Sequence, residues 1–423
     1  MRSLISSLSV LVVAAGGALA VAPPAGSAAA PAAAPASKTT PTAFALAGSG
    51  FGTRARGGAL PAGSDTTAFQ VIGCTNRAGK SNENHVTSVA LPGLGTAYGV
   101  TTRVWTVTKG STVSSYSRNS TARVVLGDAA TGVVEINGIT SLSRAFHDAK
   151  GFHARTRTAI GSILYKPAAG EAQKLELPTP GQPVTVPGVA TISVGSTAES
   201  TSRSHARAKA DTISIKSMLT MSTAQVAHSR ALIFKGIKSG LFTGRSSSAQ
   251  GTAAEDHVSF GHTPLSVMPC QGTGGAEWTK SIVRVDRGSE IFLSGLSSRQ
   301  MGEQTGILAQ GFERGRVDVL EINGGELRVE KIVGRVNVIR RAGQVERNTN
   351  GTQIGTVTAN GETQQFPDSD VLNIPGVAKL ERDIVDRSRN GISVTALRIT
   401  LLDGSGAVLN LGVARLYIKP SGR

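Results

Sequence analysis

Short sequence motifs recur in the same order in two halves of the chain, separated by about 190 residues. Each half also carries one of the chain's two cysteines, at corresponding positions. Each match is short, but their common order indicates an internal duplication. The matched segments are Cys74 with Cys270, Gly99–Arg103 with Gly295–Arg299, Val134–Gly138 with Leu320–Gly324, Val186–Ala190 with Ile374–Ala378, and Ala231–Lys235 with Arg415–Lys419.

This period is far longer than the roughly 20 to 50 residues of a stacked solenoid, so each copy is long enough to bury its own core. Valine, isoleucine and threonine alternate with polar residues in short runs, and 51 glycines and 17 prolines punctuate them. No segment keeps a helical period over three turns. The sequence therefore predicts an all-β protein of two tandem homologous β-sandwich or open-barrel domains, with mostly antiparallel sheets.

The first 30 residues have the layout of a secretory signal peptide, with a positive charge at Arg2, an apolar run and then small residues. Residues 31–41 are rich in alanine and proline, and we expect an extended tether there. The first β repeat is predicted at 42–238 and the second at 263–423, while 239–262 is either a linker or the first strand of the second repeat. No later segment is long and apolar enough to span a membrane, so we expect a secreted protein, extracellular or associated with the cell envelope.

Two cysteines in an exported chain favour a disulfide. Because Cys74 and Cys270 occupy corresponding positions, a bridge between them would tie the two repeats together. The alternative is that each thiol is buried separately as a small apolar side chain.

The formal net charge of the chain is +16, and most of it lies in the first repeat. Residues 42–262 contain 22 lysines and arginines against 11 acidic residues, whereas residues 263–423 contain 20 against 17. Outside a cell, such a surface meets anionic wall polymers, acidic polysaccharides, lipid headgroups or DNA. The excess charge either binds one of these partners or only keeps the protein soluble.

A predicted hairpin at residues 146–153 carries two histidines near one turn. If His147 and His153 face the same side, with Asp148 close by, the three side chains form a weak site for a transition metal. The second repeat has no histidine after His262, so such a site would belong to the first repeat alone.

The strand that follows this turn offers a different site. His153, Arg155 and Arg157 alternate along it, so they share one face and form a cationic strip that Arg144 can extend. Binding of an anion on this strip and an ordinary solvated strand face both remain open.

Sequence signals for catalysis are weak. There is no Gly-x-Ser-x-Gly motif, and Gly79-Lys80-Ser81 lacks the leading glycine of a phosphate-binding loop. Glu135 and Glu321 both stand in a Glu-Ile-Asn-Gly segment, where we expect a structural role in strands that lead into Asn-Gly turns. We therefore expect no catalytic residue and no cofactor.

Large aromatic residues are few. Tyr98, Trp105 and Trp278 are scattered singly in the sequence, which predicts packing roles and no stripe for stacking sugars.

The leader, the tether and the β-rich repeats together resemble secreted actinobacterial proteins of the choice-of-anchor P type. The resemblance rests on residues 132–141 (GVVEINGITS) and 152–163 (FHARTRTAIGSI). It implies an exported module associated with the surface or the wall. The chain departs from the anchored members at Lys419–Arg423, which contains no sorting motif, so we expect ionic retention or release in place of covalent attachment.

Three functional hypotheses follow. The first is a non-enzymatic secreted protein, held to an anionic cell-wall polymer or polysaccharide by the basic surface of its first repeat. The second is a secreted hydrolase or metal-dependent enzyme that uses the hairpin of His147 and His153. The third is nonspecific binding of extracellular nucleic acid, with an affinity that falls steeply with salt.

Overall fold

The computed structural model describes residues 39–56, 66–91, 93–253, 258–287, 291–404 and 406–421. These residues form β-strands joined by turns, together with one 3-10 turn, η1 (Asn323–Gly325). No helix in the described ranges is long and apolar enough to cross a membrane. The predicted signal peptide (1–30) and most of the predicted tether (31–41) lie outside the described residues.

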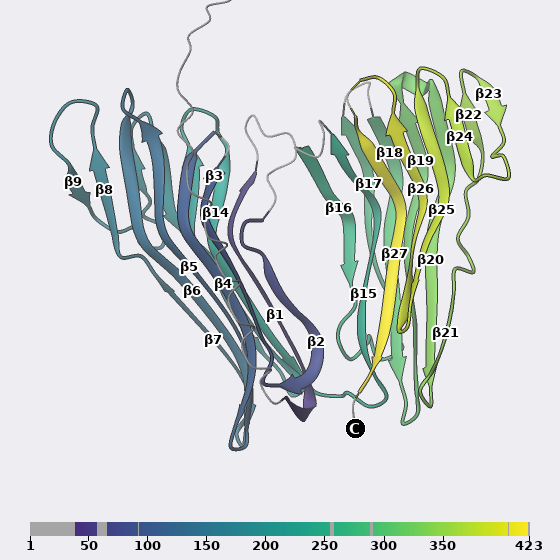
Figure 1. Ribbon diagram of the computed structural model, residues 1–423, viewed down its shortest axis with the longest axis horizontal. Coiled ribbons are helices and arrows are strands. Elements are labelled where there is room, and N and C mark those ends of the chain that lie inside the picture. The colour runs from purple at the N-terminus through teal and green to yellow at the C-terminus, as the bar shows by residue number, and fades with distance from the viewer. Residues whose placement is uncertain are drawn as a thin grey trace, which may run out of the picture. The chain divides into compact units, whose positions relative to one another are not determined.

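The first half of the chain forms two antiparallel sheets that pack face to face, drawn in purple to teal in Figure 1. The β1 sheet has the strand order β10-β11-β13-β14-β1-β2, with β12 beside β13, and the β4 sheet has the order β3-β4-β5-β6-β8-β9, with β7 beside β6. The strands of the β1 sheet are β1 (Thr40–Arg56), β2 (Gln70–Ala78), β10 (Val184–Val186), β11 (Ala190–Val194), β12 (Thr197–Thr201), β13 (His205–Ser217) and β14 (Thr223–Phe234). Those of the β4 sheet are β3 (Ser81–Leu91), β4 (Gly95–Lys109), β5 (Thr112–Asp128), β6 (Gly132–Asp148), β7 (Gly151–Ala159), β8 (Ser162–Lys166) and β9 (Gln173–Leu175).

The second half, in teal to yellow, forms another two-sheet sandwich. The β15 sheet has the order β16-β15-β27-β26-β25-β24, and the β18 sheet has the order β17-β18-β19-β20-β22-β23, with β21 beside β20. The strands of the β15 sheet are β15 (Gly240–Ala253), β16 (Val258–Val267), β24 (Val371–Ile374), β25 (Ala378–Ser388), β26 (Gly391–Leu401) and β27 (Val408–Pro420). Those of the β18 sheet are β17 (Trp278–Arg287), β18 (Ile291–Gln304), β19 (Leu308–Ile322), β20 (Leu327–Arg341), β21 (Gln344–Asn348), β22 (Val357–Ala359) and β23 (Glu362–Gln364).

The two sandwiches share one topology, because each strand of the first has a counterpart at the same place in the second, with β25 standing for β11 and β12 together. Turn geometry repeats as well. The N–H of Val189 donates to the carbonyl of Val186 at 3.1 Å, and the N–H of Val377 donates to the carbonyl of Ile374 at 3.1 Å. The predicted all-β fold of two tandem domains with antiparallel sheets is thus confirmed, and of the two predicted domain types, β-sandwich and open barrel, the structure has the sandwich. The stretch 239–262, left open between linker and strand, contains β15, which pairs with β27.

One of the five sequence matches joins strands that do not correspond in the fold, and another, Ala231–Lys235 with Arg415–Lys419, is out of register, because Ala231 packs in an inner core and Arg415 does not. Val134–Gly138 lies inside β6, whereas Leu320–Gly324 ends β19 and enters η1. By strand order β6 corresponds to β20, and β19 corresponds to β5. The recurrence of Glu-Ile-Asn-Gly is therefore not a trace of the duplication.

The two Asn-Gly pairs also have different conformations. Asn137-Gly138 was predicted to form a turn, but it is a bulge within β6, with φ of 66° at Gly138. Strand β6 pairs with β8 before this bulge and with β7 after it, so the bulge marks the change of partner. Asn323-Gly324 does form the predicted turn, between β19 and β20.

Each sandwich buries two hydrophobic cores along the length of its strands, separated by a narrow zone of serine and glycine that we call the waist. In the first sandwich, Ser115 and Ser117 of β5 each donate a hydroxyl hydrogen bond at 2.8 Å to carbonyls of β1 in the facing sheet. In the second, Ser248 donates to the carbonyl of Ser297 at 2.9 Å. Small side chains let the two backbones approach closely enough for these bonds, which hold the sheets together without apolar packing.

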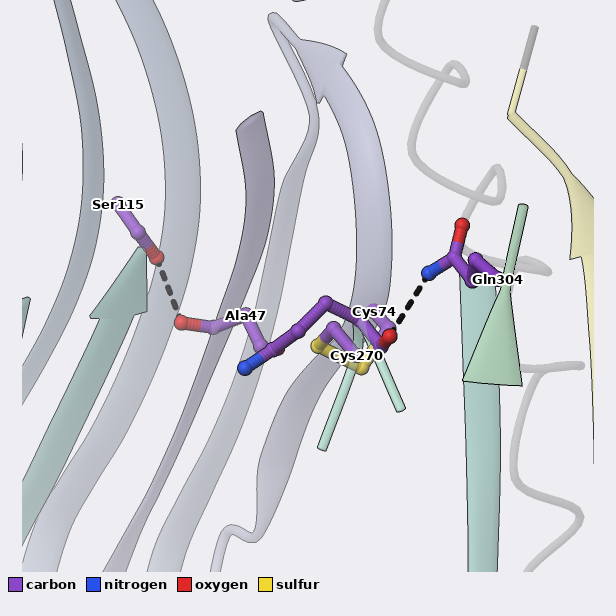
Figure 2. The surroundings of a disulfide bond; sticks show 6 residues. Ala47, Cys74, Ser115, Cys270 and Gln304 are labelled. Carbon is purple, nitrogen blue, oxygen red and sulfur yellow. Dashed lines mark hydrogen bonds between the residues drawn. A yellow bond between two sulfur atoms is a disulfide. The ribbon is translucent and has the colours of Figure 1, made fainter. Parts of the chain in front are cut away.

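A disulfide between Cys74 and Cys270 joins the two sandwiches, so the predicted bridge is confirmed. The bridge lies in an apolar cluster to which Ala47 and Phe234 of the first sandwich and Leu241 of the second contribute. Figure 2 shows the bridge beside Ala47, whose carbonyl accepts the hydroxyl hydrogen bond of Ser115. The bridge is therefore continuous with the waist of the first sandwich.

One ionisable side chain, Glu313 of β19, is fully buried at the waist of the second sandwich. Ser246 donates a hydrogen bond to its Oε2 at 2.7 Å, and its Oε1 has no hydrogen-bond partner. Burial raises the pKa of Glu313 well above 4.5, and the hydrogen bond from Ser246 offsets this rise only in part. Burial therefore favours the neutral form of this carboxyl group more strongly in the folded protein than in the unfolded chain.

We expect Glu313 to make the folded protein less stable as the pH rises. The pKa of this group is raised in the folded state, so the stability present below its unfolded pKa of 4.5 is lost as the pH climbs toward the folded pKa. The free energy of unfolding should fall by about 1.4 kcal/mol per pH unit between these two pKa values. Denaturant unfolding measured at several pH values should show this fall in the free energy of unfolding for the wild type. The Glu313→Gln variant should not show it. The exposed Glu346→Gln variant is the control, and an equal slope in all three proteins would contradict the assignment.

Candidate functional site

The cationic strip predicted from the sequence lies on the outer face of the β4 sheet. His153, Arg155 and Arg157 alternate along β7, and Arg155 is the direct cross-strand partner of Arg144 on β6. Residues directly opposite each other in neighbouring strands point to the same side of a sheet. The four predicted residues are therefore brought together on one surface.

The β6–β7 hairpin holds the imidazole of His153 in place. Its Nε2 lies 3.0 Å from Oδ1 of Asp148, and its ring stacks on Phe146 with centroids 4.8 Å apart. The backbone N–H of Lys150, followed by the His153 contact, lowers the pKa of Asp148. Asp148 is therefore an ionised partner that orients His153 on the outer face.

The predicted metal candidates do not share a face. His147 is paired across the hairpin with Phe152, and its ring packs against Phe44 and Phe152 at 4.5 and 4.7 Å between centroids, on the inner side of the sheet. Burial lowers the pKa of His147. His153 points outward, so the condition under which the two histidines would form a metal site is not met. Across the described ranges, no three His, Cys, Asp or Glu side chains are placed to hold a metal ion.

The expectation that the aromatic residues are scattered singly is wrong for the β4 sheet. Trp105 on β4 and Tyr116 on β5 are cross-strand partners, and their rings stack with centroids 4.8 Å apart and an interplanar angle of 3°. Arginine side chains lie on both sides of these two stacked rings. The guanidinium of Arg103 lies 5.4 Å from the Trp105 ring, and that of Arg144 lies 5.2 Å from Tyr116 and 4.0 Å from Phe146. We call this row of stacked arginine and aromatic side chains, which runs from Arg103 to His153, the ladder.

Positive charge on this face exceeds the nearby negative charge. Glu83 lies 3.8 Å from Arg103, and Glu135 lies 3.9 Å from Arg123 at the far end of the sheet. Three further arginines are exposed and make no ion pair with a described carboxylate: Arg118, Arg155 and Arg157. Arg155 also stands directly opposite Arg144, and like charges in that position repel.

In the second sandwich the positions of Arg144 and Arg155 carry no charge, although Arg299 and Arg314 stand at those of Arg103 and Arg118 and Arg335 lies 4.4 Å from the Phe312 ring. Asn337 and Asn348 occupy the positions of Arg144 and Arg155, and Nδ2 of Asn337 donates to Oδ1 of Asn348 at 2.9 Å. Met301 and Phe312 form the cross-strand pair where the first sandwich has Trp105 and Tyr116. The stack of Trp105 on Tyr116 and the opposition of Arg144 and Arg155 therefore belong to the first sandwich, and no requirement of the shared fold explains them.

A second pair of a histidine and an aspartate lies on the outer face of the β1 sheet. His228 Nδ1 is 2.6 Å from Oδ1 of the buried Asp211, and its ring stacks on Phe51. Burial acts to raise the pKa of Asp211, but His228 and Lys209 outweigh it and hold that pKa below its ordinary value. Ser196 donates to the carboxylate at 3.0 Å, and no described hydroxyl hydrogen-bonds to the imidazole. The pair resembles the base half of a catalytic triad but has no nucleophile.

The repeated glutamates do not form a catalytic pair either. Glu135 and Asp148 stand on one strand, thirteen positions apart, which places them roughly 40 Å from each other. Two carboxylates that share a glycosidic bond lie within about 10 Å. Glu321 ion-pairs with Arg328 on the neighbouring strand, in the other sandwich.

The chain was also compared with known proteins. No protein-family model matches it, and no curated protein resembles it in sequence, so the resemblance to choice-of-anchor P proteins stays a prediction.

Proposed function

We propose that this chain is a non-enzymatic exported protein that binds an extended anionic polysaccharide, such as a cell-envelope polymer, on the outer face of its β4 sheet. The observation that carries the proposal is the direct opposition of Arg144 and Arg155, flanked by exposed Arg157 and Arg118, none of which forms an ion pair with a described carboxylate. A bound polyanion would remove the repulsion and add charge-assisted hydrogen bonds.

The ladder suits this partner because it orients the arginines. A guanidinium that lies over an aromatic ring keeps its N–H edge free for a carboxylate or phosphate oxygen. Arg144, held between Tyr116 and Phe146, loses less conformational freedom on binding than a free side chain would. Neighbouring strands lie about 4.8 Å apart, so arginines on β5, β6 and β7 present a row of charges to a linear polymer.

Two further observations favour an exported protein. The leader has the layout of a signal peptide, and a disulfide persists in oxidising compartments outside the cytosol. Retention at the envelope would then be ionic and weaken as salt screens the surface charge.

The experiment replaces Arg144 and Arg155 by asparagine, the residues that the second sandwich carries at these positions, so the variant should fold. Binding of the chain from residue 31 onward to isolated cell wall and to polygalacturonate is measured across a salt series. We expect the affinity to fall roughly a hundredfold, since each arginine that is removed takes away charge-assisted hydrogen bonds that contribute about tenfold.

The matched control is the variant Arg341→Asn/Arg387→Asn, which removes the same charge from exposed positions of the second sandwich. We expect its affinity to change by less than about threefold, because distant exposed charges are screened. An equal loss in both variants would mean that net charge alone drives binding. Tighter binding of oligothymidylate than of either polysaccharide would instead support the nucleic-acid hypothesis.

A further inference from the structure

A hollow of about 290 Å³ opens at one end of the second sandwich, between the β20–β21 turn, the β25–β26 turn and the end of β27. Three arginines line it, Arg340, Arg347 and Arg389, together with Asn390. No described carboxylate lines it. The hollow is therefore a concave cationic surface, separate from the ladder and in the other repeat.

Arg340 is rigidly held at the base of this hollow. It is 6% exposed, and it donates from Nε to the carbonyl of Ile418 at 2.7 Å and from Nη2 to Oδ1 of Asn390 at 2.7 Å. Burial, followed by the charge of Arg389, lowers the pKa of Arg340. A fixed positive charge thus lies near a second positive charge, and no described carboxylate forms an ion pair with Arg340.

Arg347 adds an unsatisfied donor. Its Nε is buried and has no hydrogen-bond partner, and its Nη1 makes only a long contact of 3.5 Å to the carbonyl of Val345. A buried N–H without an acceptor lowers stability unless a ligand or water completes it. An oxyanion in the hollow would supply that acceptor.

The first sandwich closes the same end with apolar packing. His147 stands at the position of Arg340, paired with Phe152 as Arg340 is paired with Val345. Its ring packs against Phe44 and Phe152. Arg203 of the first sandwich stands at the position of Arg389, but no arginine stands there at those of Arg340 and Arg347, so the shared fold does not require these two.

We propose that this hollow binds an oxyanion of the phosphate type, either free or carried by a small organic group. Arg389 and Arg347 contact the anion, and Arg340 sets the charge and shape of the base. The volume exceeds what a single phosphate fills, which favours a phosphate attached to a compact group such as a sugar. Arginine is suited to this role because its planar donors match phosphate oxygens in pairs.

The test is calorimetric titration of the chain from residue 31 onward with inorganic phosphate and with glucose 6-phosphate, at constant ionic strength. We expect one site per chain, with affinity reduced tenfold or more in Arg347→Gln and in Arg389→Gln. Arg341→Gln removes the same charge from an exposed neighbour that does not line the hollow, and it should bind as the wild type does. Tighter binding of glucose 6-phosphate identifies an organic phosphate, and equal binding identifies free phosphate.

A second measurement needs no variant. Hydrogen exchange of the wild type with and without inorganic phosphate should show protection at 343–347 and 389–390. Absence of heat and of protection with both probes would overturn the proposal, as would equal losses in Arg341→Gln and Arg347→Gln. The polysaccharide experiment is unaffected by either result, since it depends on Arg144 and Arg155.

Discussion

Replacing Cys74 and Cys270 together by alanine is expected to lower the free energy of unfolding by about 5 kcal/mol. The two residues are 196 positions apart, and a cross-link stabilises a protein mainly by restricting its unfolded chain, more so for longer loops. The loop closed here contains most of the first sandwich. Denaturant unfolding of the oxidised wild type and of the double variant, compared at their midpoints, measures the effect.

The control is to repeat both measurements in the presence of a reductant. Reduction should destabilise the wild type by the same amount and leave the double variant unchanged. Two separate transitions in the variant, with a midpoint for one sandwich equal to that of the wild type, would show that the sandwiches unfold independently. The bridge would then contribute orientation and not stability.

Gly334→Ala is expected to destabilise the second sandwich by about 3 kcal/mol, because it overpacks the waist. A Cβ at Gly334 would lie 1.7 Å from the carbonyl oxygen of Gly412 in the facing sheet. The obstacle is backbone, so no side chain can rotate away, and the two sheets would have to separate. The expected result is a lower denaturant midpoint with an unchanged dependence on denaturant concentration.

Gly306→Ala is the matched control. A Cβ there meets no atom within 4 Å and the residue lacks a positive φ, so its midpoint should stay the same or rise slightly. A wild-type midpoint for Gly334→Ala would mean that the sheets can part at the waist without loss. The cross-sheet hydrogen bonds of the serines would then have little energetic weight.

Much of the fold could be predicted from local pattern alone. Alternation of apolar and polar residues identifies β-strands because one side of each sheet is buried, and the recurrence of Val186–Ala190 at Ile374–Ala378 reports a real structural equivalence. The position of the cysteines predicted their bridge. Short motifs are less safe, since Glu-Ile-Asn-Gly recurs by chance in strands that do not correspond.

Only part of the candidate site could be predicted from the local sequence pattern. Alternation along β7 is sufficient to place His153, Arg155 and Arg157 on one face. The ladder needs the register between strands, which depends on contacts distant in sequence. Tyr116 also lies in a polar, serine-rich stretch without the apolar alternation of a strand, because its inward positions are occupied by the small serines of the waist. The stacking of Trp105 on Tyr116 was therefore invisible in the sequence.

The waist has a consequence for how such a chain can change over evolutionary time. The cross-sheet hydrogen bonds of Ser115, Ser117 and Ser248 end on main-chain carbonyls, which every residue possesses, so these accepting positions carry almost no information in their side chains. Only the donors and the closely packed glycines are constrained. Most other positions are free to drift, including those on the outer faces, as Arg144 in one repeat and Asn337 in the other illustrate. Two copies can thus keep one architecture while the similarity between their sequences is reduced to a few short motifs.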